Sequence, residues 1–224
     1  MIIIGHRGAS GNFPENTLAA FRAAAELGCA WVELDVHVLE GELVVIHDEQ
    51  LNRTTNGDGH LTTAGLAGVR ALDAGNGEQV PLLSEVLATL NGNVAINVEL
   101  KGSGTAEPTS QLLLAACDAG IWRPDQFLLS AFDHRELQRA NPIFPRGVLW
   151  GRPADDMIAR SLAMGGQWMN IALKAATAER VTAAQQAGLK VAIYTVNEPC
   201  DLAAMRALGV DAVFCDYPER GLQA

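Results

Sequence analysis

Histidine, arginine and carboxylate side chains lie where apolar runs of this sequence end. The first run, Ile2–Gly5, is followed by His6 and Arg7, and a glycine stands on each side of that pair. The second run contains Glu33 and Asp35. Because side chains two residues apart in a strand share a face, these two carboxylates point the same way. Groups of these types, if they meet, could bind a cation, hold an anion and transfer a proton.

His47 joins this set through a predicted hairpin. Too few residues follow Val38 for a crossover helix, and Leu39–Gly41 fits a three-residue hairpin loop with glycine in the left-handed position. In that register Val38 pairs with Glu42. Counting back along the two antiparallel strands then places His47 opposite Glu33.

The charges of these groups indicate what they bind. Glu99 and Lys101 also stand two apart in an apolar run. The three carboxylates, Glu33, Asp35 and Glu99, offer only oxygen atoms and therefore suit Mg²⁺ or Ca²⁺ better than zinc. With Arg7 and Lys101 the set carries one net negative charge, and one divalent cation would make it positive and attractive to a phosphate. The two histidines, with an ordinary pKa of about 6.5, are then suited to act as acid and base.

Each group also has an ordinary structural explanation, because histidines and paired carboxylates are common at the solvated ends of strands. Glu33 and Glu99, however, lie inside apolar runs, where an unpaired charge is costly. The coincidence of four such strand ends therefore favours a functional site. We assign no role to His60, His134 or His37, although His37 shares the strand face of Glu33.

Strands and amphipathic helices alternate along almost the whole chain, which indicates parallel strands with right-handed crossovers. The predicted strands are Ile2–Gly5, Trp31–Val38, Leu43–Ile46, Val94–Leu100, Phe127–Ser130, Gly147–Trp150, Trp168–Ile171, Val191–Thr195 and Ala212–Cys215. The predicted helices include Glu15–Leu27, Leu82–Leu90, Ser110–Ala119, Ala178–Ala187 and Asp201–Leu208. A helix is expected to begin at Pro14. Helices are expected to end at Gly28, Gly120, Gly188 and Gly209.

Without the return strand of the hairpin, eight βα units remain, and we predict a single (β/α)8 TIM-barrel domain over residues 1–224. Residues 49–80, rich in Asn, Thr, Gly and Asp, are expected to form a folded insertion of irregular loops over one end of the barrel. A doubly wound open sheet is the alternative. It usually has a glycine-rich phosphate loop after its first strand, which HRGASGN does not resemble.

Composition narrows the class of partner. The 224 residues include 26 acidic and 16 basic ones, a net charge of −10, which argues against nucleic acids and anionic membranes. The sequence starts with no signal-peptide pattern and has no apolar run long enough to span a bilayer, so a cytoplasmic protein is expected. The four cysteines, which have no metal-type spacing, are expected to be reduced thiols.

Eight short motifs follow one another along the chain: GHRGAS, PENT, ELDV, VVIHD, LNRTTNG, VPLLSEVL, VELK and YTVN. In this combination the sequence resembles the glycerophosphodiester phosphodiesterases, in particular the short cytoplasmic bacterial type, as far as the closing DAVFCDYP. The resemblance implies a TIM barrel of the phospholipase C-like phosphodiesterase type with an insertion after the second strand. It also implies hydrolysis of small glycerophosphodiesters, such as glycerophosphocholine or glycerophosphoethanolamine, to sn-glycerol 3-phosphate and an alcohol.

The resemblance further implies a role for each site residue and one bound divalent cation, Mg²⁺ or Ca²⁺. The implied roles are acid/base catalysis for His6 and His47, metal binding for Glu33, Asp35 and Glu99, phosphate contact for Arg7 and Lys101, a border of the glycerol side for Tyr194, and support of His6 for Asn16. One departure is Ser130-Ala131-Phe132, because the family often has serine directly before phenylalanine at this place.

Other readings of the site are possible. The attacking group can be the 2-hydroxyl of the substrate glycerol, which gives a cyclic phosphate, or water, and either histidine can be the acid. A glycosidase would leave both histidines, Arg7 and Lys101 without a role. A lysophospholipase D-like or other phosphodiester hydrolase is closer, but no long apolar loop for an acyl chain is evident. An inactive phosphate-ester binding protein would lack a catalytic or metal residue, and none is missing. We therefore expect an active hydrolase.

Overall fold

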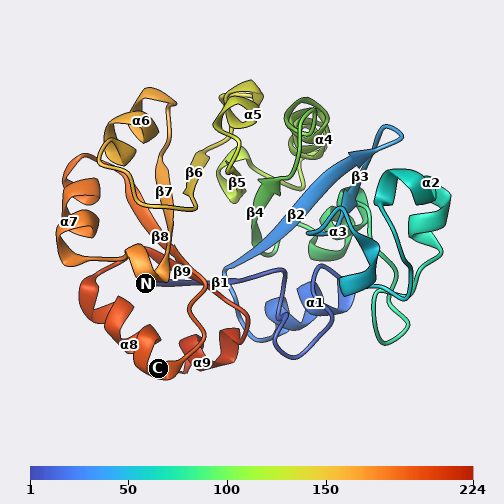
Figure 1. The fold of residues 1–224 in the computed structure, drawn as a ribbon, viewed down its shortest axis with the longest axis horizontal. Helices are drawn as coiled ribbons and strands as arrows, with labels where there is room; N and C mark the ends of the chain where they lie inside the picture. The colour runs from blue at the N-terminus through green and yellow to red at the C-terminus, as the bar shows by residue number, and fades with distance from the viewer. Residues whose placement is uncertain (224) are drawn as a thin grey trace.

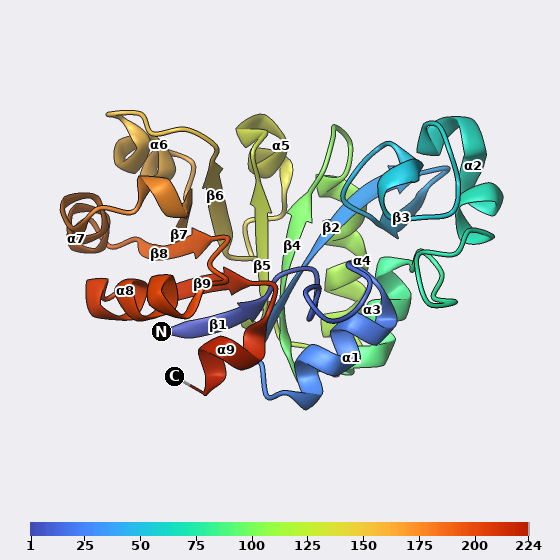
Figure 2. The ribbon, with the colours of Figure 1, turned by 60° about the horizontal axis from the view of Figure 1, so that its bottom comes forward.

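The structure, a computed structural model that describes residues 1–223, is built on one sheet that closes into a barrel (Figures 1 and 2). The strands are β1 (Ile2–Gly5), β2 (Trp31–Leu39), β3 (Glu42–Val45), β4 (Ala95–Leu100), β5 (Phe127–Ala131), β6 (Arg146–Trp150), β7 (Trp168–Ala172), β8 (Lys190–Tyr194) and β9 (Ala212–Cys215). Their order is β1-β9-β8-β7-β6-β5-β4-β2-β3. Parallel pairing of β1 with β2 closes eight of them, so the predicted (β/α)8 fold is confirmed.

Helices surround the barrel on its outer face (Figure 1). They are α1 (Leu18–Glu26), α2 (Leu61–Arg70), α3 (Leu83–Leu90), α4 (Ala106–Asp118), α5 (His134–Arg139), α6 (Met157–Ala163), α7 (Ala178–Gln186), α8 (Pro199–Leu208) and α9 (Pro218–Leu222). Apolar side chains between helices and strands form the main core, and a smaller cluster that includes Ile4, Leu128 and Trp168 joins β1, β5 and β7. Among residues 1–223 there is no helix of the length and hydropathy that a bilayer span requires.

The β2–β3 hairpin differs from the prediction by one residue. Leu39, not Val38, pairs with Glu42, so the loop contains two residues instead of three. Both loop residues have positive φ, 51° at Glu40 and 86° at Gly41, which is the pattern of a type I′ turn. Such turns usually begin with Asn, Asp or Gly, and a glutamate in that position gave no signal in the sequence.

This shift in register changes the position of His47. β3 ends at Val45, and Ile46 donates a backbone hydrogen bond of 3.1 Å to Asp35. His47 therefore follows the strand. The prediction that it lies opposite Glu33 was wrong. It reaches the barrel mouth from the connection that leads into residues 49–80.

The first helix begins later than predicted. Thr17 is its N-cap, with Oγ1 accepting from the backbone N–H of Ala20 at 3.2 Å and donating to the carbonyl of Pro14 at 2.7 Å. Pro14 thus lies in the turn before α1 and does not open it. The stops were predicted correctly: Gly28, Gly120, Gly188 and Gly209 all have positive φ at the ends of α1, α4, α7 and α8.

Residues 49–80 are more regular than predicted. They contain a short 3-10 helix, Leu51–Arg53, and helix α2, which bends where Gly65 has a φ of 68°. Their apolar side chains form a separate cluster with those of β2 and β3, and α2 lies beside β3 in both views (Figures 1 and 2). The expectation of irregular loops was therefore wrong for 61–70, where Leu61 and Val69 are the buried residues of the helix.

Candidate active site

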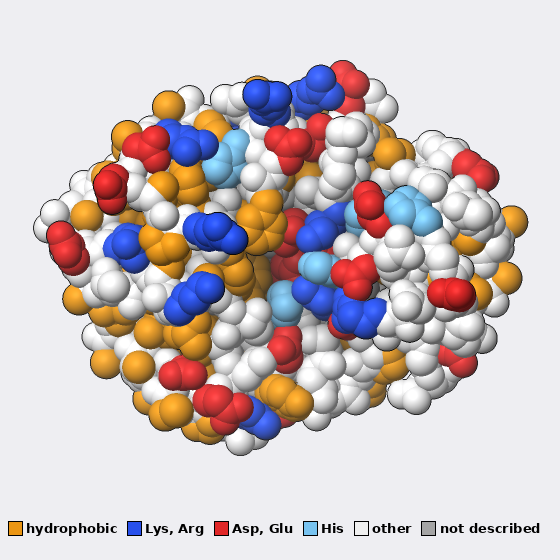
Figure 3. Space-filling model, in the orientation of Figure 1, with side chains coloured by type: hydrophobic (Ala, Val, Ile, Leu, Met, Phe, Trp, Pro, Cys, Tyr) orange, Lys and Arg blue, Asp and Glu red, His pale blue; other side chains and the backbone are white. Residues whose placement is uncertain are grey.

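The chemically competent side chains meet at the carboxyl ends of the barrel strands. They surround a cavity of about 150 Å³. Its lining residues are His6, Arg7, Glu33, His47, Asn97, Glu99, Phe132, Leu149, Tyr194, Thr195 and Phe214. The space-filling view shows acidic, basic and histidine side chains gathered around a central hollow, with apolar side chains along one side (Figure 3). This is the end of the barrel where enzymes of this fold hold their catalytic groups.

Three carboxylates form the floor of the site. Asp35 and Glu99 are paired neighbours on β2 and β4, and Glu33 lies one inward-facing position earlier on β2. One oxygen of each residue lies within 4.8 Å of one oxygen of each of the others, and all three side chains are buried. Burial and the charge of Asp35 raise the pKa of Glu33 to about 8.

The same carboxylates fit a hard cation. Glu33 Oε1 and Asp35 Oδ1 are buried, and neither has a hydrogen-bond partner among residues 1–223. Unsatisfied buried carboxylate oxygens are costly, and three oxygen donors at this spacing match the preference of Mg²⁺ and Ca²⁺. The donor set therefore fits the divalent cation that the sequence led us to expect.

Two positively charged side chains, those of Arg7 and Lys101, lie against these carboxylates. Arg7 Nε is 3.3 Å from Asp35 Oδ2, and Lys101 Nζ is 2.9 Å from Glu99 Oε1. The turn after β1 gives Arg7 a φ of 54°, and its backbone N–H donates to Glu33 at 2.9 Å. Gly8 makes this turn possible, because a Cβ atom at that position would lie 2.6 Å from the backbone of the facing helix α1.

His6 is held by the carboxylate of Asp216, a residue to which the sequence motifs gave no role. Its Nδ1 shares a hydrogen bond of 2.6 Å with Asp216, which directly follows β9. Asp216 also accepts from Ser10 and Asn197, and these contacts outweigh burial and lower its pKa to about 2. Burial alone would lower the pKa of His6, but Asp216 and the charge of Glu33 raise it. An aspartate at the carboxyl end of the last barrel strand was the signal available in the sequence.

His47 has a different environment. Its Nδ1 lies 2.5 Å from Asp48 Oδ1, and Lys101 Nζ lies 3.1 Å from its Nε2. Because a lysine ammonium group can only donate, Nε2 is the acceptor and Nδ1 carries the proton that is donated to Asp48. Burial lowers the pKa of His47. Together with the positive charges of Arg7 and Lys101, burial outweighs Asp35 and Asp48, which raise this pKa.

Asn16 has another partner than the one we predicted. Its side-chain amide donates to Asp35 Oδ2 at 2.9 Å, and its Oδ1 accepts from the backbone N–H of Asp35 at 3.3 Å. The expectation that it supports His6 was therefore wrong. The cause is local, because a φ of 59° at Asn16 turns the end of the PENT loop toward β2.

Aromatic side chains form the apolar side of the cavity. The Tyr194 hydroxyl donates to the carbonyl of Trp150 at 2.8 Å, which fixes the ring. That ring lies edge-on to Phe132 and Phe214, with centroids 5.9 and 6.5 Å away. Phe132 reaches the cavity, whereas Ser130 is buried within β5. The cavity thus has one charged side and one apolar side.

Comparisons with known proteins agree with this arrangement. Residues 6–220 match the model of the glycerophosphoryl diester phosphodiesterase family. Glycerophosphodiester phosphodiesterases of Caldanaerobacter subterraneus subsp. tengcongensis and Bacillus altitudinis are 32% and 33% identical, over 97% and 99% of this chain and 95% and 96% of theirs. A solved Oleispira antarctica phosphodiesterase, in complex with the product sn-glycerol-3-phosphate, is similar with a TM-score of 0.90 and 30% identity, covering 100% of this chain and 96% of that one.

Proposed function

Since this chain belongs to the glycerophosphoryl diester phosphodiesterase family, we propose that it hydrolyses small glycerophosphodiesters to sn-glycerol 3-phosphate and an alcohol. Glycerophosphocholine and glycerophosphoethanolamine are the proposed substrates. The observation that carries this proposal is the meeting, around one cavity, of three carboxylates and two histidines that each have a carboxylate partner. The product bound to the similar Oleispira antarctica enzyme supports it.

Glu33, Asp35 and Glu99 hold one divalent cation, Mg²⁺ or Ca²⁺, in this proposal. The unpartnered buried oxygens of Glu33 and Asp35, and the close approach of Glu99 to both, support the assignment. The bound cation supplies positive charge next to the phosphodiester. Arg7 and Lys101 add fixed charges next to the same carboxylates, where they contact the phosphoryl oxygens and stabilise the negative charge of the transition state.

The two histidines divide the proton transfers. His47 rests neutral: its Nδ1–H donates to the Asp48 side chain, and the lone pair of its Nε2 accepts from Lys101. A proton can be taken up at Nε2, and His47 therefore acts as the base. His6 lies between Asp216 and Glu33, which favour its protonated form, and therefore acts as the acid. Two titratable groups whose environments move their pKa values in opposite directions are suited to such a division.

The proton balance of the reaction follows from this division. His47 takes the proton of the attacking hydroxyl, which belongs either to the glycerol of the substrate or to water. His6 donates its proton to the oxygen of the leaving alcohol as the P–O bond breaks. If the glycerol attacks first, the resulting cyclic phosphate is opened by water, with the two histidines exchanging roles.

Release of sn-glycerol 3-phosphate tests the proposal. Purified protein is stripped with EDTA, given Mg²⁺, Ca²⁺ or Mn²⁺ separately, and incubated with glycerophosphocholine or glycerophosphoethanolamine. We expect release only after a divalent cation is returned. Release that is unaffected by stripping would contradict the role of the carboxylates, and no release with any ion would contradict the proposed substrates.

Asp216→Asn is expected to weaken the acid without removing it. The amide cannot stabilise a positive ring as the carboxylate does, so the pKa of His6 should fall toward or below its ordinary value. The alkaline limb of the kcat/KM pH profile should then move to lower pH, with at least about a tenfold loss at pH 8. NMR titration of the His6 ring measures the same pKa directly.

Asp125→Asn, which changes an exposed carboxylate far from the barrel mouth, is the control for Asp216→Asn. It should leave the profile in place. An unshifted His6 titration in Asp216→Asn would show that the charge of Asp216 does not set the protonation of His6.

A further inference from the structure

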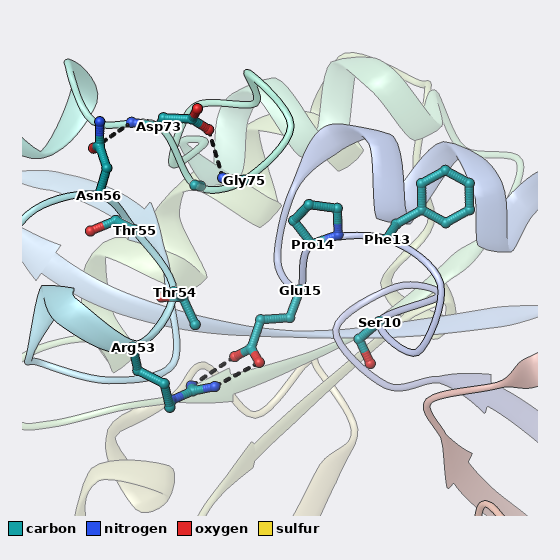
Figure 4. Close-up of a pocket in the computed structure, with 11 residues that line it drawn as sticks. Ser10, Phe13, Pro14, Glu15, Arg53, Thr54, Thr55, Asn56, Asp73 and Gly75 are labelled. Carbon is teal, nitrogen blue, oxygen red and sulfur yellow. Dashed lines mark hydrogen bonds and ion pairs between the residues drawn. The ribbon is translucent and has the colours of Figure 1, made fainter.

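A second cavity, of about 520 Å³, lies outside the mouth, between the loop that precedes α1 and residues 53–75 (Figure 4). The Arg53 side chain extends across it to Glu15. Arg53 Nη1 donates to Glu15 Oε2 at 2.7 Å, and Nη2 donates to Oε1 at 2.8 Å. The third donor of the same guanidinium, Nε, contacts Asp48. One arginine of the LNRTTNG motif therefore holds two carboxylates.

Each of these carboxylates also contacts a residue of the active site. Glu15 Oε1 accepts from Arg7 Nη1 at 2.7 Å. Asp48 Oδ1 shares the 2.5 Å hydrogen bond with His47. Two carboxylates thus link Arg53 to a phosphate-binding group and to the base, although Arg53 does not line the inner cavity.

The Arg53 guanidinium is suited to this position. It is planar and rigid, and its donors are fixed in a fork that a lysine cannot reproduce. Its hydrogen bond is the largest influence on Asp48 and lowers the pKa of that carboxyl to about 2. Burial raises the pKa of Glu15, but Arg53 and Arg7 outweigh it and lower the pKa. Both carboxylates are therefore negatively charged hydrogen-bond acceptors over the whole pH range in which enzymes work.

We propose that Arg53 is a positioning residue: through Glu15 and Asp48 it fixes the orientations of Arg7 and His47, so that residues 49–80 help to set the geometry of the active site. The inference rests on the proposed function for its effect on turnover, but not for the geometry itself. A general effect on stability is a weaker explanation. Arg53 is 45% exposed, and exposed ion pairs contribute little to folding.

Turnover of Arg53→Gln and Arg53→Lys tests this inference. Misorientation of reacting groups by about 1 Å can cost on the order of 100-fold, so we expect kcat of Arg53→Gln to fall roughly 10- to 100-fold. KM should change less than kcat, because the phosphate-binding charges are still present. Lysine should restore only part of kcat. Arg123→Gln, which breaks an exposed arginine–carboxylate pair elsewhere, should behave like the wild type.

Two further measurements separate positioning from other effects. In the background Glu15→Gln/Asp48→Asn, the additional Arg53→Gln change should cost less than threefold, because its partners are already lost. The ring ¹H–¹⁵N NMR signals of His47 should shift in Arg53→Gln and Arg53→Lys without substrate. This second readout stands even if the wild type releases no sn-glycerol 3-phosphate, which would contradict the proposed function alone.

Three results would overturn the inference. These are a kcat of Arg53→Gln within twofold of the wild type, a His47 ring spectrum that is unchanged in both variants, and losses that add fully in the combined variant. If Arg53→Gln does not fold, Arg53→Lys carries the same comparison, because it keeps the charge and removes only the fork.

Discussion

Replacing His6 or His47 by alanine is expected to lower kcat by roughly 10²- to 10⁴-fold, the usual contribution of a positioned acid or base. The structure explains why neither loss should be compensated. Asp216 holds Nδ1 of His6 and Asp48 holds Nδ1 of His47, so Nε2 is the nitrogen of each ring that remains for proton transfer. Steady-state release of sn-glycerol 3-phosphate at saturating substrate and cation measures the effect.

The leaving group can reveal which histidine is the acid. An alkoxide leaving group needs a proton, whereas p-nitrophenolate leaves without one. With glycerophospho-p-nitrophenol as substrate, His6→Ala should regain most of its lost activity, and His47→Ala should not. The reverse pattern would exchange the two roles, and equal losses of both variants on both substrates would contradict a division of acid and base.

His60→Ala is a suitable control for these variants. His60 is a histidine of the same insertion that follows His47, but it contacts Glu49 and Thr62 away from the cavity. Its replacement should leave kcat within about twofold of the wild type, as for most surface substitutions. Near-normal turnover of either His6→Ala or His47→Ala would remove that residue from the mechanism.

Loss of the proposed cation, or of one of its proposed ligands, should have an effect of similar size. A divalent cation contributes several kcal/mol to stabilising the charge of a phosphoryl transition state, which corresponds to a factor on the order of 10³ or more in rate. Glu33→Gln and Glu99→Gln should therefore lose most cation-dependent release. Glu179→Gln, an exposed glutamate on α7, is the control. Full activity of the two site variants would show that these carboxylates are not ligands.

The pH dependence of stability offers a readout that does not depend on turnover. In the cation-free protein the pKa of Glu33 is raised from its ordinary value of 4.5 to about 8, so the folded state binds this proton more tightly than the unfolded chain. Stability is then lost as pH rises through this interval. A bound cation competes with the proton and removes the penalty.

Calorimetry with and without Mg²⁺ or Ca²⁺ can measure this competition. The rise in Tm caused by the cation should be larger at pH 8 than at pH 6 in the wild type, because fewer protons have to be displaced at pH 8. In Glu33→Gln the cation should raise Tm little at either pH. A cation effect that is equal at both pH values in the wild type would contradict the proposed ligand set.

Much of the site could be predicted because it depends on strand geometry. Glu33, Asp35, Glu99 and Lys101 lie at alternate positions of β2 and β4 or directly after them, and parallel strands bring such positions to one mouth. Two-residue periodicity is fixed by the backbone, so the convergence of these side chains required no knowledge of loops.

What could not be predicted depends on loop conformation. The register of the hairpin was missed because Glu40 adopts a left-handed conformation that its residue type rarely takes. The bond between Asn16 and Asp35 depends on a similar turn. The contacts of Arg53 join two loops whose paths no periodicity determines. Motif order can indicate that such residues matter, but not which neighbour they hold.

The closure of the barrel also determines when, during synthesis, the active site can be completed. β1 pairs with β9 as well as with β2, and this pairing brings Asp216 to His6, 210 positions away in sequence. During synthesis His6, the proposed acid, emerges near the beginning, but its partner Asp216 is among the last residues of the barrel to be made. A chain in which β9 is not yet made, or is detached from β1, would therefore carry most of the site but lack the carboxylate that holds His6. We expect such a chain to have little activity, so that activity would indicate a completed barrel.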